Sequence, residues 1–118
     1  TMEVEQEIKE LIKKEAIKAN PQECCGLITQ SSEGETKIWP SINSAPDPEK
    51  NFVIKLQDYL MAEQTGGEVV GVYHSHPKGD KAFSEADTVN AQKLELISVL
   101  YLLEKDQFHI FEPEIEEY

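Results

Sequence analysis

Residues 68–77 read EVVGVYHSHP, and this stretch decides both the fold and the chemistry that we expect. Its valines are β-branched and favour extended backbone, so residues 68–76 are predicted to form a strand. Successive side chains of a strand point to opposite faces, so His74 and His76 share one face. Two neighbouring imidazoles at the end of a strand can bind one metal ion.

A polar loop and a helix are expected to follow the histidines. Ser84 is a good helix N-cap, and the helix is predicted to extend to about residue 92. Asp87 falls in the first turn of this helix, where its carboxylate can face back toward the histidines. Two neutral nitrogens and one carboxylate, with a fourth position open, are the pattern of a catalytic zinc site. The same ligand types would also accept iron, manganese or cobalt.

Each part of this pattern also has a structural explanation. Ser84-x-x-Asp87 is an ordinary helix start, and taken alone it is better interpreted as capping. His74 and His76 could equally be unrelated surface or core residues. The combination favours a metal site, because two of the three histidines, a strand–loop–helix context and an acid at the return of the loop coincide.

A metal-dependent hydrolase also needs a group that accepts a proton from water. Among 23 acidic residues, Glu23 is the best candidate because it directly precedes the apolar run 24–29. Partial burial at such a position would raise the pKa of its carboxyl group into a useful range. The alternative is a solvated acid at a helix–strand junction, and Glu23 by itself favours that alternative.

The remaining sequence predicts an α/β or α+β domain in which helices cover a mixed sheet. An amphipathic helix begins near Val4 and ends near Asn20-Pro21, and another helix is expected over 56–64. We expect one domain over 1–118, with 112–118 as a loose acidic tail. Besides 68–76, strands are predicted over the following segments: 24–29, 36–40, 52–54, 97–103 and 107–111.

Composition excludes several classes of partner. The chain has 118 residues and a net charge of −12, which argues against nucleic acid and against anionic lipid. No apolar run approaches the roughly 20 residues of a membrane span, so we expect no membrane partner and a cytoplasmic location. Cys24 and Cys25 are adjacent, which excludes a disulfide scaffold and leaves packing as small apolar side chains.

Two motifs resemble one known family. HSHP at 74–77, followed after six residues by Ser84-x-x-Asp87, resembles the signature of the JAMM metallopeptidases, the JAB/MPN-domain family. The segment PQECCGL at 21–27 resembles the N-terminal strand of that family. The resemblance implies a JAMM fold of cytidine-deaminase-like type, with a curved mixed sheet flanked by helices.

The resemblance also implies roles for individual residues. His74, His76 and Asp87 would bind Zn²⁺, and Glu23 would be the general base that acts on the water at the metal. Ser84 would hydrogen-bond the oxyanion of the tetrahedral intermediate. The sequence departs from the family motif at none of these five positions.

The sequence is also similar to the N-terminal domain of phage tail assembly proteins of the lambda K type. Those proteins often carry a second, NlpC-type cell-wall hydrolase domain, so such a hydrolase and phage tail proteins are expected partners. Other prokaryotic JAMM proteins, including those that process ubiquitin-like sulfur carriers, share much of the same pattern. The narrower likeness comprises ECCGLI at 23–28, Asn43 with the proline-containing loop after it, Phe52, HSHP, and FHIFEP at 108–113.

A zinc-dependent peptidase or isopeptidase is therefore the leading hypothesis. Its substrate would be a peptide or isopeptide bond in a tail protein, a peptidoglycan stem peptide or a ubiquitin-like C-terminus. A phage-derived protein would work in the bacterial host cytoplasm or in the virion. The alternatives are a non-catalytic assembly module of the same fold and a cupin-like iron oxygenase that uses the same histidine pair.

Overall fold

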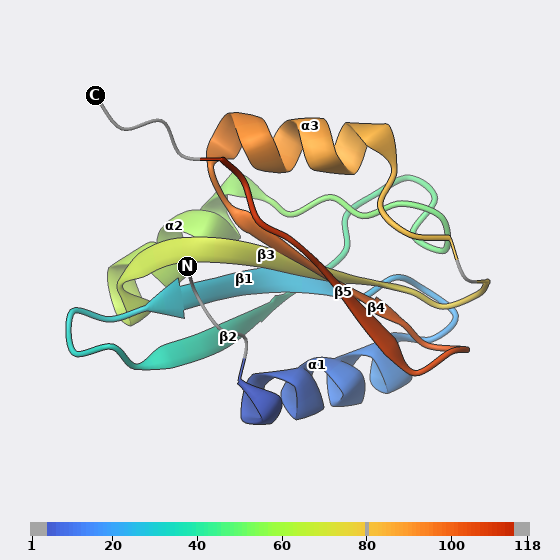
Figure 1. Cartoon of the computed structure of the whole chain (residues 1–118), viewed down its shortest axis with the longest axis horizontal. Helices are drawn as coiled ribbons and strands as arrows, with labels where there is room; N and C mark the ends of the chain where they lie inside the picture. Colours follow the sequence, from blue (N-terminus) through green and yellow to red (C-terminus); the bar gives the residue numbers. More distant parts are fainter. Residues whose placement is uncertain (1–4, 80, 115–118) are drawn as a thin grey trace.

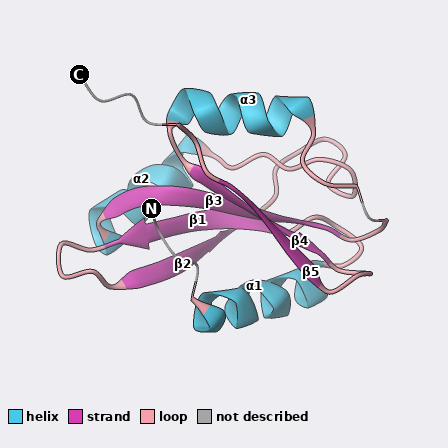
Figure 2. Cartoon of the chain, in the orientation of Figure 1, coloured by secondary structure: helices cyan, strands magenta, loops and turns pink. Residues whose placement is uncertain are grey.

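The computed structural model describes residues 5–79 and 81–114, which form a mixed five-stranded sheet with three helices. The strand order is β2-β1-β3-β4-β5, and only the β3–β4 pair is parallel. Figure 1 shows α1 against one face of the curved sheet, with α2 and α3 on the opposite face, and Figure 2 separates helices from strands. The elements are α1 (Gln6–Ala19), β1 (Cys25–Gln30), β2 (Thr36–Ser41), α2 (Leu56–Gly66), β3 (Glu68–His76), α3 (Glu85–Leu94), β4 (Ile97–Leu102) and β5 (Gln107–Phe111).

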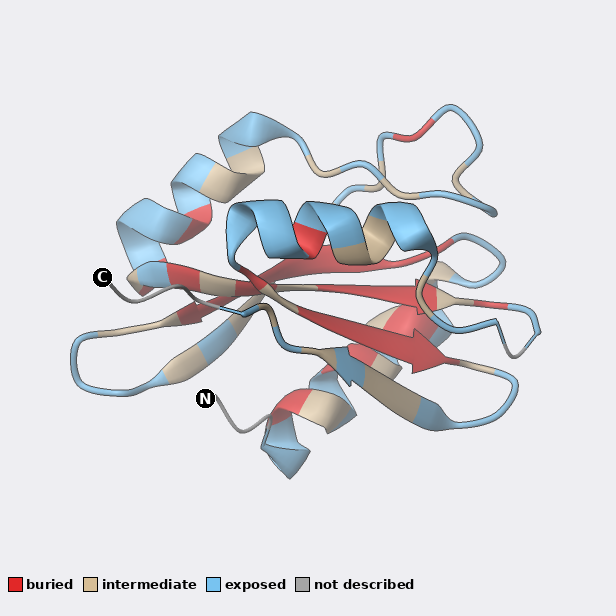
Figure 3. Cartoon of the chain, turned by 45° about the horizontal axis from the view of Figure 1, so that its top comes forward, coloured by how far each residue is buried: buried red, intermediate tan, exposed pale blue. Residues whose placement is uncertain are grey.

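The sheet separates two apolar cores. Ile8, Ile12 and Ala16 recur every four residues on α1, so one stripe of that helix is buried against the sheet. On the opposite face, Leu27 and Ala62 belong to a second cluster that lies beneath α2. Figure 3 shows that the buried residues are concentrated in the central strands β1, β3 and β4. The framework that carries the histidines is therefore covered on both faces.

A β-bulge determines which face of the sheet the two histidines occupy. Ile28 of β1 pairs with Gly71 and the next residue pairs with Val69, so one extra residue is inserted in β3. Val69 and Val72 therefore lie in the same core cluster, although strict alternation would separate them. Alternation resumes after the bulge, and it places His74 on the face of Val72, toward α2 and α3.

Most of the predicted elements are confirmed, and one is wrong. The expected curved mixed sheet flanked by helices is observed, and the predicted strand and helix ends agree with the observed ones within about two residues. Segment 52–54, however, is not a strand. The amide of Val53 donates to the side chain of Asn43, and its carbonyl accepts from Ser44, so this backbone makes loop contacts in place of a ladder.

Three expectations concern parts of the chain that lie partly or wholly outside the described residues. The predicted start of the first helix at Val4 and the tail residues 115–118 fall there, so the single domain over 1–118 stays a prediction.

Cys24 and Cys25 are described, and both are buried free thiols, as expected from their adjacency. Within 5–79 and 81–114, no helix has the length and apolar character needed to cross a bilayer.

Candidate metal centre

The pairing of β1 with β3 brings Glu23 to the histidines. Cys25 lies opposite His74, and the contact continues one residue further. There the Ser75 amide donates to the Cys24 carbonyl at 3.1 Å, and the Ser75 hydroxyl accepts from the Cys24 amide at 2.9 Å. If this register continued for one more residue, Glu23 would lie opposite His76. The sheet therefore places an acidic side chain beside the histidine pair.

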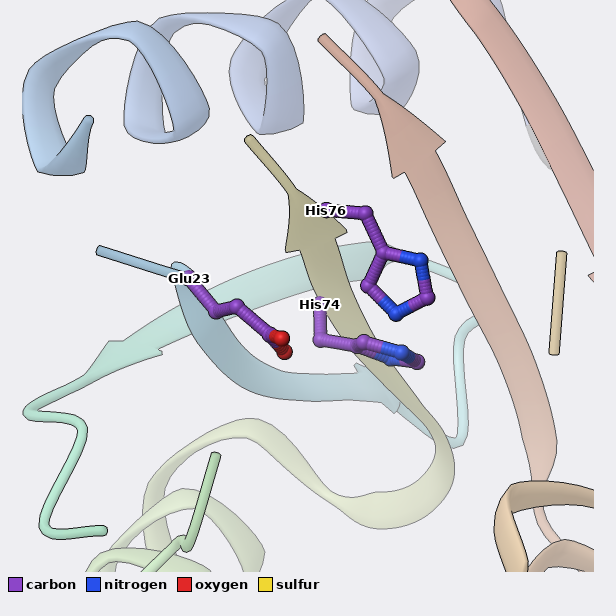
Figure 4. A group of neighbouring side chains, drawn as sticks. All are labelled: Glu23, His74 and His76. Atoms are coloured by element: carbon purple, nitrogen blue, oxygen red, sulfur yellow. The ribbon is translucent and has the colours of Figure 1, made fainter. Parts of the chain in front are cut away.

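Glu23, His74 and His76 form a compact cluster of potential metal ligands. One ligand atom of each residue lies within 4.8 Å of the other two. Figure 4 shows the Glu23 carboxylate, which comes from the segment before β1, beside the two imidazoles at the end of β3. Among the described residues, this cluster is the candidate metal site.

His74 has the properties of a metal ligand. Its side chain is buried, and neither ring nitrogen has a hydrogen-bond partner among the described residues. Burial lowers the pKa of His74 to about 4, so at neutral pH the ring is uncharged and can donate a lone pair to a metal. A buried polar group without a partner costs free energy, and metal ligation would satisfy one of these nitrogens. The donor set therefore fits a divalent cation.

His76 is oriented by the backbone of the loop that follows it. Its Nδ1 lies 2.7 Å from the Lys81 carbonyl oxygen. Because a carbonyl only accepts hydrogen bonds, Nδ1 carries the proton and Nε2 keeps its lone pair for a metal. The His74 and His76 rings meet edge to face, with centroids 5.2 Å apart.

Asp87 lies in the first turn of α3, and its carboxylate makes two kinds of contact. Its Oδ2 accepts from the Ser84 amide at 3.1 Å and lies 3.8 Å from His74 Nε2. Two ligand atoms of a tetrahedral zinc ion are separated by about 3.4 Å, so 3.8 Å is close to a ligating separation. Asp87 is not a member of the three-residue cluster described above. The capping and the ligating interpretations of the sequence are therefore compatible with each other.

Ser84 caps α3, as expected. Its hydroxyl oxygen accepts from the Asp87 amide at 3.1 Å, and together the two residues make a reciprocal capping box. This contact uses an oxygen lone pair and leaves the hydroxyl hydrogen free to donate elsewhere. The predicted hydrogen bond from Ser84 to an oxyanion stays a prediction.

Glu23 is buried, and its acidity is strongly altered. The residue is 4% exposed, so the solvated position that was the alternative for Glu23 is wrong. Burial, and secondarily the negative charge of Asp87, raise the pKa of Glu23 to about 7. A carboxyl group with such a pKa can both accept and release a proton near neutral pH.

An apolar groove of about 630 Å³ lies beside the site, between α2, α3 and the segment that leads into α2. Asp87 is part of its lining, so the groove reaches the candidate ligands. The apolar part of the lining includes Leu27, Leu56, Tyr59, Leu94 and Leu96. An apolar groove with a few polar groups in its lining is a common arrangement for binding a ligand.

Two contributors to the site have no recognisable sequence signal. The Phe52 ring stacks on His74 with centroids 4.4 Å apart and an interplanar angle of 22°. The sequence marks Phe52 only as part of a likeness to tail assembly proteins, and not as a neighbour of a histidine. The Lys81 carbonyl is a backbone group, so no residue type at that position would reveal its contact with His76.

Comparison with known proteins identifies the family of this chain. Residues 5–112 match the family model described as prokaryotic homologs of the JAB domain, and the chain belongs to that family. A particular relative is the tail tip assembly protein K of Escherichia phage N15, which is 39% identical over 67 residues. Those residues are 57% of this chain and 27% of the phage protein, so the likeness covers only about a quarter of that relative.

Three solved structures share the fold at low sequence identity. A protein from Desulfitobacterium hafniense has a TM-score of 0.67 and 22% identity over 96% of this chain and 91% of that one. A JAB1/MPN domain protein from Archaeoglobus fulgidus has a TM-score of 0.55 and 19% identity, covering 92% and 88% of the two chains. A protein from Salinibacter ruber has 0.55 and 21%, covering 95% and 90%. The fold is JAB/MPN-like, and the open sheet excludes the barrel of a cupin-like oxygenase.

The role of Asp87 as a ligand can be separated from its role as a helix cap. Asp87→Ala removes both the carboxylate beside His74 and half of the capping box, whereas Ser84→Ala removes the other half of the box and keeps the carboxylate. We expect Asp87→Ala to bind zinc about 100-fold more weakly or worse, and Ser84→Ala to keep one zinc per chain. Elemental analysis and competition with a chromogenic chelator measure both. Equal zinc affinity in the two variants would show that Asp87 is only a cap.

The buried Glu23 carboxyl predicts a pH dependence of stability in the metal-free protein. Its pKa is raised from the ordinary value of 4.5 to about 7, so between these values the folded state holds a proton that the unfolded state releases. The contribution of Glu23 to the free energy of unfolding therefore falls as the pH rises through this window.

Glu23→Gln removes this titration. Relative to wild type, the variant should gain about 2–3 kcal/mol of stability between pH 5 and pH 8. Urea unfolding with EDTA present measures the difference. The buried His74 gives the free energy of unfolding the opposite pH dependence at lower pH, but both proteins keep His74, so its contribution cancels in the comparison. Parallel stability curves for the two proteins would contradict the burial of an ionisable Glu23.

Proposed function

We propose that this JAB-family chain is a zinc-dependent peptidase or isopeptidase. The observation that carries the proposal is the buried Glu23 carboxyl, with a pKa of about 7, next to two imidazoles that can bind a metal. A structural metal site has no need of an additional acid poised to exchange a proton near neutral pH. A hydrolase that activates water has that need.

His74, His76 and Asp87 are the residues that would hold the metal. When bound by these residues, zinc would supply Lewis-acid polarisation of a scissile carbonyl and a lowered pKa for a coordinated water. Glu23 accepts the proton of the attacking water and returns it to the leaving amine, since its pKa permits both transfers. Ser84 donates its free hydroxyl hydrogen to the oxyanion that develops on the substrate.

The groove supports a polypeptide substrate. Its lining is mainly aliphatic and aromatic, α3 contributes to that lining, and Asp87 connects the groove to the candidate ligands. An extended chain with apolar side chains could bury them there while its scissile bond lies at the metal site.

Glu23 and Asp87 are both acidic, so a bound dication would also offset their mutual repulsion.

The likeness to the tail tip assembly protein of phage N15 favours a tail-assembly context. In that context the substrate would be a tail protein or a peptidoglycan stem peptide, and an NlpC-type hydrolase would be a partner. The C-terminus of a ubiquitin-like sulfur carrier is the alternative substrate. A non-catalytic assembly module would keep the fold without cleaving any of these.

Glu23→Gln should reduce hydrolysis to a low residual rate while zinc stays bound. The substitution keeps the size of the side chain and removes its ability to accept a proton, so we expect at least a 100-fold loss of kcat. The assay is a mass-spectrometric cleavage screen against stem peptides, tail proteins and ubiquitin-like fusions. Wild-type protein treated with a chelator, and then resupplied with Zn²⁺, is the control for metal dependence.

The screen separates the alternatives. Cleavage that survives complete removal of metal would contradict the proposed mechanism, as would full activity in Glu23→Gln. Loss of zinc in Glu23→Gln would instead make Glu23 a ligand. If zinc-loaded wild-type protein binds a tail protein but cleaves no substrate, the chain is an assembly module.

A further inference from the structure

Asn43 lies just after β2, and its side-chain amide is hydrogen-bonded on every side. It is half-buried at the base of the loop 43–53, and this loop contacts the candidate metal site through the ring of Phe52. The two hydrogens of its Nδ2 are shared among three carbonyl acceptors, those of Glu23 at 3.0 Å, Pro48 at 3.2 Å and Asn51 at 2.9 Å. Its Oδ1 accepts from the amides of Ala45 at 3.0 Å and Val53 at 3.2 Å.

Only part of this pattern is ordinary turn chemistry. The contact from the Ala45 amide spans two residues and is a common local contact of asparagine in loops. The Nδ2 group instead reaches carbonyls at separations of 5, 8 and 20 residues. The orientation of the amide is determined by its surroundings, since carbonyls need the NH₂ group and amides need the oxygen. Asn43 therefore connects separate segments of the chain.

One of these segments carries Glu23. The Glu23 carbonyl accepts from Asn43 Nδ2, and the Glu23 amide donates to the Pro48 carbonyl at 2.7 Å. Pro48 is itself held by Asn43. The loop that Asn43 organises therefore holds both the backbone amide and the backbone carbonyl of Glu23. This support comes from outside the β1–β3 ladder, which begins only at Cys25.

The other segment carries Phe52. The carbonyl of Asn51 and the amide of Val53, which flank Phe52, both bind the Asn43 side chain. Phe52 in turn stacks on His74, with centroids 4.4 Å apart. The same amide therefore fixes the backbone of the proton acceptor and the backbone of the ring that packs against a candidate ligand.

We propose that Asn43 is a positioning residue that sets Glu23 and Phe52 relative to His74. The inference rests on the proposed function in one respect, namely that Glu23 moves a proton. In the described part of the chain, the Asn43 side chain makes no hydrogen bond to His74, His76 or Asp87. Asn43 affects turnover by orienting Glu23, and it affects the packing against the His74 ring by orienting Phe52.

Two substitutions and one control test this role. Asn43→Ala removes all five contacts, whereas Asn43→Asp keeps the acceptor for Val53 and turns a carboxylate oxygen toward the Glu23, Pro48 and Asn51 carbonyls. Asn43→Asp thus provides a second test if Asn43→Ala does not fold. The matched control is Ser44→Ala, which removes one hydrogen bond to the Val53 carbonyl in the same loop and does not touch Glu23.

The first measurement uses metal-free protein and does not depend on catalysis. Stacking of Phe52 shifts the His74 ring-proton resonances upfield, so Asn43→Ala should move them toward their ordinary positions. The amides of Glu23 and Val53 should exchange with solvent at least about tenfold faster in Asn43→Ala. In Asn43→Asp the Glu23 amide should exchange faster by a similar factor. Ser44→Ala should keep the wild-type ring resonances and the wild-type exchange of Glu23.

The second measurement uses zinc-loaded protein and the substrate found in the cleavage screen. Asn43→Ala should lower kcat on the order of 10- to 100-fold, with KM within about twofold of wild type and one zinc per chain retained. Because Asn43 acts through Glu23, adding Asn43→Ala to Glu23→Gln should cause little further loss of kcat. Ser44→Ala should turn over like wild type.

The two measurements distinguish a failure of the positioning role from a failure of the proposed function. Unchanged His74 ring shifts and unchanged Glu23 exchange in the variants would overturn the positioning role, whatever the protein hydrolyses. Additive losses in the double variant, or a change in KM alone, would also overturn it. If wild-type protein cleaves nothing, the proposed function fails, and the metal-free measurement still decides the role of Asn43.

Discussion

The site depends on the antiparallel pairing of β1 with β3 and on its continuation to the residue that precedes β1. Ser75, which lies between the two histidines in the sequence, binds the Cys24 backbone through its own backbone and hydroxyl, and this contact brings the adjacent residue, Glu23, to the site. The bulge in β3 decides that the histidines face α3, which carries Asp87. Without this register, the acid and the imidazoles would lie on different faces of the sheet.

Burial shifts the pKa values of His74 and Glu23 and so determines their protonation near neutral pH. The same low-polarity environment keeps the His74 imidazole neutral and keeps the Glu23 carboxyl protonated to unusually high pH. Both shifts cost stability in the metal-free chain, and a bound dication would offset part of that cost. The site thus resembles other functional sites in which local instability is tolerated because it prepares groups for a reaction.

The sequence predicts some parts of this arrangement well, for identifiable reasons. Strand alternation suffices to place His74 and His76 together, and a serine followed by an acid three residues later suffices to predict the capping box of α3. The proximity of Glu23 depends on pairing between segments about 50 residues apart, and only the resemblance to JAMM proteins signalled it. Residues 52–54 have strand propensity, but the Val53 amide donates to the side chain of Asn43 and the Val53 carbonyl accepts from Ser44, which local patterns cannot show.

The most direct test of the account is an anomalous difference map at the zinc absorption edge, from crystals of protein purified with zinc. The account predicts one peak at about 2.0–2.2 Å from a nitrogen of His74, a nitrogen of His76 and an oxygen of Asp87, with Glu23 close by but not coordinated. A peak coordinated by Glu23 in place of Asp87, or no peak near the histidines, would contradict it.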